Sequence, residues 1–157
     1  MWLRRRNIVK EDSVIRGMAE SCPPKANMIK NKEHLQQIKD FSGLKFGSIS
    51  PTDIDGFLDF GNRLFIFVET KYAKSELRGG QKLALERLCD ACQTQFRTSI
   101  LIVTNHDSSG EIDIGETVVQ QYRLRGVWYE STDITLREAI EMFYSNFAIT
   151  KKEDKNG

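Results

Sequence analysis

The chain has 157 residues, of which 39% are hydrophobic and 10% aromatic, and its formal net charge is +1. This length supplies one sizeable core, so we expect a single domain over residues 1–150 and a flexible tail over 151–157. No run of about 18 apolar residues occurs, and the start MWLRRRNIVKEDS is too charged for a secretory leader, so we expect no membrane span and a cytoplasmic location. Three cysteines, an odd number, do not indicate a disulfide framework.

The charges are distributed unevenly along the chain. Residues 1–40 carry nine Lys and Arg against five Asp and Glu, a basic surplus of four, whereas residues 107–116 hold four acids and no base. A near-neutral total neither requires nor excludes a nucleic-acid partner. The acidic segment 107–116 is therefore an unfavourable surface for the phosphate backbone of a nucleic acid.

The first predicted elements are a helix and a short extended segment. Asn31 is a suitable N-cap for KEHLQQIKDF, residues 32–41, in which apolar residues recur at helical spacing. Residues 45–49 read as a short extended segment that Pro51 ends. We therefore expect one helix before the first long strands.

A β-hairpin is predicted next. From Ile54 to Phe60 the sequence alternates between two faces, and Gly61-Asn62 supplies a turn. Residues 64–68, LFIFV, form a continuous apolar run, as expected of a central strand covered on both sides. The two strands then lie antiparallel.

The remaining pattern completes a mixed α/β domain. We expect a helix over 81–96, a buried strand over 99–106, a strand or hairpin over 118–131, and a final helix over 135–147. Helices and strands that alternate in this way are typical of a sheet flanked by helices.

Polar residues follow directly after the central apolar run. Alternate residues of a strand share a face, so Glu69 and Lys71 point to one side, and Asp55 on the neighbouring strand can face them. Two converging carboxylates suit Mg²⁺, or Mn²⁺ as a substitute, and the backbone carbonyl of Thr70 can add a ligand. With Lys71 to orient water or contact phosphate, this set suits phosphodiester hydrolysis.

The same residues resemble the PD-(D/E)XK nuclease superfamily, which includes restriction endonucleases and junction resolvases. The resemblance covers roughly residues 30–106 and rests on Asp55, the hairpin turn and Glu69-Thr70-Lys71. It implies a restriction-endonuclease-like core, with a three-strand meander in a central mixed β-sheet flanked by helices. It also implies that Asp55 and Glu69 bind metal, that Thr70 offers its carbonyl, and that Lys71 is the catalytic lysine.

Further site residues are suggested by the resemblance. Many members add a glutamate from the first helix, for which Glu33 is the best-placed candidate and Glu20 the reserve. Some add a glutamine at the start of the next helix, where Gln81 stands. The literal Pro-Asp pair is absent, so either Asp53 or Asp55 is the main ligand; we prefer Asp55, whose place inside the alternating strand suits pairing with Glu69. Asp53 would then shape the turn or bind a second metal.

These observations predict a metal-dependent nuclease that acts on DNA and can pair as a homodimer. No Gly-rich phosphate loop occurs, so no nucleotide cofactor is expected. The alternatives are a non-catalytic nucleic-acid-binding or assembly subunit that keeps the nuclease fold, and a structural protein that pairs through a sheet edge. Cys89 and Cys92 form a CxxC within a helical pattern and are interpreted as ordinary buried residues, because a zinc site normally needs four ligands.

Overall fold

The computed structural model describes residues 42–73, 75–131 and 133–153. The chain divides into two units, Met1–Ser48 and Ile49–Gly157. In the described part of the first unit, η2 (Ser42–Leu44) is a single 3-10 turn. The extended segment predicted over 45–49 is wrong, because Gly47, with φ of 63°, turns the backbone there. The helix predicted over 32–41 lies outside the described residues.

The predicted hairpin is confirmed and consists of β1 (Gly56–Phe60) and β2 (Leu64–Tyr72). Its antiparallel register pairs Gly56 with Val68 and Phe60 with Leu64. Gly61 and Asn62 both adopt positive φ values, 63° and 59°, which these two residue types tolerate. The second strand continues four residues past the apolar run, so Glu69 to Tyr72 are held in the sheet.

In the described part of the chain, five strands form one mixed sheet in the order β1-β2-β3-β4-β5. After α2 (Gly79–Cys92), β3 (Thr98–His106) runs parallel to β2. The 3-10 turn η3 (Ile114–Glu116) precedes β4 (Val118–Leu124) and β5 (Val127–Glu130), which continue the sheet with antiparallel pairing. The final helix is α3 (Leu136–Glu153). The mixed α/β prediction is confirmed.

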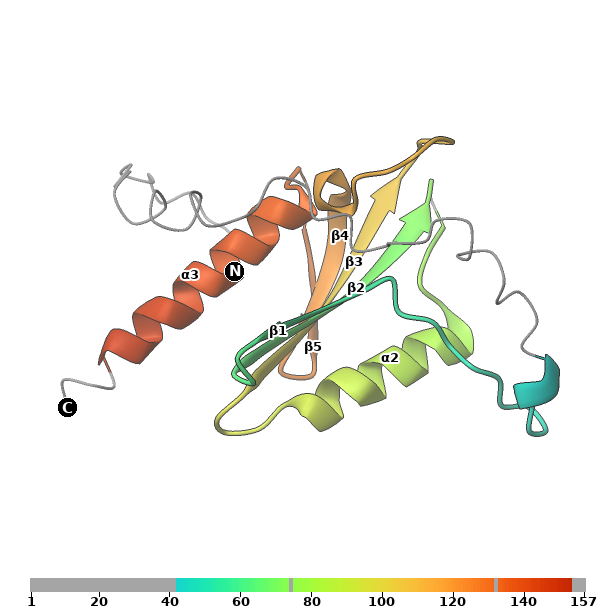
Figure 1. The fold of residues 1–157 in the computed structure, drawn as a ribbon, viewed down its shortest axis with the longest axis horizontal. Coiled ribbons are helices and arrows are strands. Elements are labelled where there is room, and N and C mark those ends of the chain that lie inside the picture. The colour runs from blue at the N-terminus through green and yellow to red at the C-terminus, as the bar shows by residue number, and fades with distance from the viewer. Residues whose placement is uncertain (1–41, 74, 132, 154–157) are drawn as a thin grey trace. The chain divides into compact units, whose positions relative to one another are not determined.

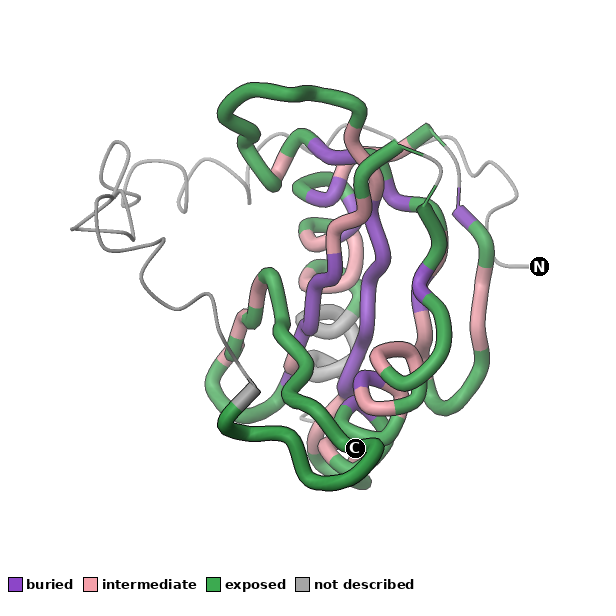
Figure 2. Tube along the Cα trace, turned by 90° about the vertical axis from the view of Figure 1, so that its right-hand side faces the viewer, coloured by how far each residue is buried: buried purple, intermediate pink, exposed green. Residues whose placement is uncertain are grey.

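The helices α2 and α3 cover opposite faces of the sheet (Figure 1). Even-numbered residues of β2 pack toward α3, and odd-numbered residues pack toward α2. Figure 2 shows the buried segments gathered along the central strands. The α3-side cluster contains Leu64, Ile66, Val68, Ile100, Ile102, Val119, Tyr122, Leu136 and Ala139. The α2-side cluster contains Phe67, Leu77, Leu85, Cys89, Leu101 and Val103.

Both helices differ in length from the sequence-based prediction. The helix α2 ends at Cys92 and not at 96, because Arg97 donates through Nε to the Cys92 carbonyl oxygen and closes the last turn. The helix α3 continues to Glu153, into the segment predicted as a tail. Cys89 is buried, with Sγ 3.4 Å from the hydroxyl oxygen of Ser99. No helix in the described ranges is long and apolar enough to cross a bilayer.

Candidate active site

Glu69 and Lys71 lie near the C-terminal end of β2, on the face of the sheet that α2 covers. Alternation along the strand places both on the side of Phe67, which belongs to the α2-side core. Only 3% of Glu69 is exposed. Lys71 Nζ lies 2.7 Å from Glu69 Oε1, and its side chain keeps 20% of its surface exposed. The two residues therefore form an ion pair with a buried carboxylate and a water-accessible ammonium group.

Asp55 reaches this pair from the neighbouring strand. It directly precedes β1, and the hairpin register, continued by one residue, sets it opposite Glu69. Its Oδ2 accepts a hydrogen bond from the Thr70 backbone N–H at 2.6 Å. The Thr70 hydroxyl, by contrast, contacts Thr104 at 3.0 Å, so only the backbone of Thr70 is turned toward Asp55. The register and this hydrogen bond place Asp55 beside Thr70 and across the hairpin from Glu69.

Gln81 joins the acidic residues to the lysine. As the third residue of α2, it lies in the first turn of that helix. Its Nε2 donates to Glu69 Oε1 at 2.8 Å and to Asp53 Oδ1 at 3.2 Å. Its Oε1 accepts from Lys71 Nζ at 2.7 Å. One amide thus fixes the ammonium group relative to two carboxylates.

The structure therefore brings together most of the predicted site. The residues in hydrogen-bond contact are Asp53 and Gln81, Asp55 and the Thr70 backbone, and Glu69, Lys71 and Gln81. Glu33 and Glu20 lie outside the described residues. Both aspartates contact the site, Asp55 through the Thr70 backbone of β2 and Asp53 through the Gln81 amide. Which of the two is the main metal ligand therefore stays a prediction.

Burial makes Glu69 an unusual carboxylate. It raises the pKa of Glu69 above the usual value; the hydrogen bond from Lys71 lowers the pKa, while the charge of Asp55 raises it again. Within the described residues, Glu69 Oε2 is buried and accepts no hydrogen bond. An unpaired buried oxygen of this kind costs free energy and calls for a further partner.

The donor set fits a divalent cation in two respects. Carboxylate oxygens are the ligands that Mg²⁺ and Mn²⁺ prefer, and Glu69 Oε2 is an acceptor without a donor among the described residues. No group of three or more His, Cys, Asp or Glu side chains in the described ranges is arranged to hold a metal ion. A cation at this place would therefore need oxygen donors besides the side chains of Asp55 and Glu69.

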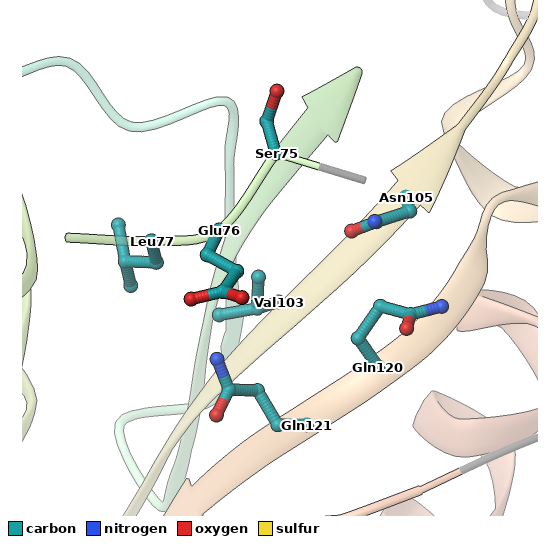
Figure 3. Close-up of a pocket in the computed structure, with 7 residues that line it drawn as sticks. All are labelled: Ser75, Glu76, Leu77, Val103, Asn105, Gln120 and Gln121. Carbon is teal, nitrogen blue, oxygen red and sulfur yellow. The ribbon is translucent and has the colours of Figure 1, made fainter. Parts of the chain in front are cut away.

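A cavity of about 200 Å³ (Figure 3) lies on the α2 side of the sheet and is lined in part by Val103, the partner of Glu69 on β3. Its wall residues are Ser75, Glu76, Leu77, Val103, Asn105, Gln120 and Gln121. Sequence reasoning missed this cavity. One signal was available: the adjacent glutamines in VVQQYRL interrupt the alternation expected of a strand.

Comparison of the chain with protein-family models, with curated proteins and with solved structures finds no significant match. The resemblance to the PD-(D/E)XK nucleases therefore depends on the residues and geometry of the chain itself.

Proposed function

We propose that this chain is a metal-dependent nuclease that hydrolyses DNA phosphodiester bonds. The observation that carries the proposal is the buried Glu69 carboxylate. One of its oxygens is held by Lys71 and Gln81, and the other has no partner among the described residues. Asp55 stands across the hairpin from it. A purely structural salt bridge does not need a second carboxylate or an unpaired buried oxygen.

Asp55 and Glu69 would hold Mg²⁺, with the Thr70 carbonyl as a further oxygen donor. The bound ion would lower the pKa of a water molecule and offset negative charge on the phosphate. The positive charge of the ion would favour the ionised form of Glu69 in spite of its burial. The restriction-endonuclease-like character of the core belongs to this proposal, as does a homodimer that reaches both strands of a duplex.

Lys71 would act at the phosphate. Its ammonium group has three N–H donors, and two acceptors, Glu69 Oε1 and Gln81 Oε1, are in place at 2.7 Å. A third N–H is left to orient the attacking water or to donate to a phosphate oxygen. Gln81 is a positioning residue, because it fixes Lys71 and Glu69 relative to each other. Donors fixed before the reaction stabilise the transition state without reorganisation.

The decisive experiment is incubation with single-stranded, duplex, flapped and four-way DNA, in Mg²⁺, Mn²⁺ or EDTA. We expect cleavage of at least one substrate in the metals and none in EDTA. Asp55→Asn should be inactive. Asp59→Asn is a matched control, since Asp59 lies in β1, four residues after Asp55 and on the same side of the chain, and its side chain accepts the backbone N–H of Asn62 in the turn.

A different outcome would favour a non-catalytic function. If no substrate is cleaved in either metal but DNA still binds, the chain is a nucleic-acid-binding or assembly subunit. Cleavage that is equal in EDTA and Mg²⁺ would also contradict the role given to Asp55 and Glu69.

A further inference from the structure

The cavity begins one strand away from the proposed active site. In the parallel register of β2 and β3, Val103 pairs with Glu69 and Asn105 pairs with Lys71. Neighbouring strands lie about 4.8 Å apart, so a DNA strand whose phosphate contacts Lys71 has a base within reach of this cavity. The cavity is therefore placed to receive a part of the substrate next to the reacting phosphate.

A β-bulge turns two glutamine side chains toward the cavity. Val103 pairs with Gln121 and Thr104 with Val119, so Gln120 is an extra residue in β4. Val119 and Tyr122 both belong to the α3-side core, which leaves Gln120 and Gln121 together on the α2 side. Neither glutamine side chain forms a hydrogen bond in the described part of the chain, so both amides are available to a ligand.

The opposite wall carries a carboxylate. Ala73 adopts a left-handed backbone, with φ of 52°, and its N–H donates to the His106 carbonyl oxygen at 2.6 Å. This strained residue directly follows β2. Glu76 and the buried Leu77, a few residues further on, line the cavity. Figure 3 shows the Glu76 carboxylate and the Gln121 amide pointing toward each other. The polar groups thus converge from two sides.

We propose that this cavity binds a nucleobase of the DNA strand whose phosphate is cleaved. The proposal rests on the proposed function for the identity of the polymer. None of the described residues that line the cavity is Lys or Arg, and Glu76 Oε2 accepts from the Arg78 guanidinium at 2.9 and 3.0 Å, which leaves Glu76 Oε1 to a ligand. Amide and carboxylate groups instead match the hydrogen-bonding edge of a base. Leu77 and Val103 offer apolar contact to its flat surface.

The donors and acceptors also select among bases. A carboxylate accepts from an exocyclic amino group, and a glutamine amide pairs with an edge that has both an acceptor and an amino group. Adenine, cytosine and guanine carry exocyclic amino groups, whereas thymine presents an acceptor at that place, which a carboxylate repels. The cavity therefore prefers adenine or cytosine to thymine.

The test is DNA binding measured by fluorescence anisotropy in EDTA, where cleavage does not interfere. Oligo-dA, oligo-dC and oligo-dT of equal length are compared, together with an abasic strand. We expect wild-type protein to bind oligo-dA or oligo-dC at least about fivefold more tightly than oligo-dT, the scale of one good base contact. Gln121→Met should remove most of that preference while leaving oligo-dT affinity unchanged.

Two further variants make the result interpretable. Gln120→Met changes a more exposed residue of the same bulge and should also weaken the preference, which guards against a folding defect at Gln121. Gln95→Met is the matched control, because Gln95 is exposed in the loop between α2 and β3, outside the cavity. Thermal melting of all three confirms that they are folded.

The inference is overturned if wild-type protein binds the strands equally, or if both glutamine variants keep the full preference. This result is separate from the cleavage test. Loss of preference in Gln121→Met together with no cleavage in Mg²⁺ would leave the base cavity standing and remove the hydrolytic function. Metal-dependent cleavage without base preference would support the hydrolytic function and remove the base cavity.

Discussion

Replacing Lys71 with methionine tests the ion pair at the centre of the site. Methionine keeps the unbranched shape of the side chain but removes the charge and both hydrogen bonds. The Glu69 carboxylate, only 3% exposed, then keeps only Gln81 as a donor among the described residues. A hydrogen bond to a charged group contributes about 1.5–3 kcal/mol, and breaking a fully buried pair costs about 3–5 kcal/mol. Because water reaches Lys71, we expect a loss of about 2 kcal/mol in the free energy of unfolding.

The loss should depend on pH in a defined direction. Burial already raises the pKa of Glu69 above its usual value of 4.5, and removing Lys71 raises the pKa further. The folded state then binds a proton more tightly than the unfolded state, so stability falls as pH rises from the unfolded pKa through the folded pKa. Lys71→Met should therefore be less destabilising near about pH 5 than near about pH 8.

Urea denaturation at both pH values measures this effect. The double variant Lys71→Met with Glu69→Gln removes both charges and should recover stability to within about 1 kcal/mol of wild type, because no uncompensated charge remains. Cleavage should fall about 10²-fold or more in Lys71→Met, the loss seen when an electrostatic donor is removed. Wild-type cleavage by Lys71→Met would refute the catalytic assignment, and unchanged stability at both pH values would refute the buried ion pair.

Three other predictions address the ligands and the cysteines. Asp55→Asn should abolish cleavage while Asp53→Asn leaves measurable activity; the reverse ranking in a gel assay would make Asp53 the main ligand. Millimolar Mn²⁺ should raise the melting temperature of wild type but not of Asp55→Ala, since a ligand bound by the folded state stabilises it, and equal shifts would remove Asp55 from the site. Burial raises the pKa of the Cys89 thiol, so mass spectrometry should find iodoacetamide on Cys92 and not on Cys89 of the native protein.

The sequence predicted those features that depend on neighbouring residues. Alternation before Gly61-Asn62 predicted the hairpin, and the run LFIFV predicted a strand covered on both faces. Alternation also placed Glu69 and Lys71 on one face. These predictions succeeded because the period of a strand and the backbone preferences of Gly and Asn are local properties of the chain.

The limits of each element were harder to predict. The apolar run ends at Val68, yet β2 continues to Tyr72, because pairing with β3 supplies backbone hydrogen bonds to the polar residues as well. The helical pattern persists to residue 96, but the Arg97 side chain ends α2 at Cys92. The C-terminal ends of β2 and α2 both depend on hydrogen bonds from other parts of the chain. The periodicity of the sequence carries no information about these hydrogen bonds.

The sequence by itself determined the α/β class and which chemical groups the hairpin brings close together. Only the tertiary structure decided that Gln81 contacts Asp53, Glu69 and Lys71, that Glu69 Oε2 is buried, and that a bulge turns Gln120 and Gln121 into one cavity. The physical reason is sequence separation. Such contacts depend on strand register and on how α2 docks against the sheet, and a shift of one residue in either would send the same side chains to the other face.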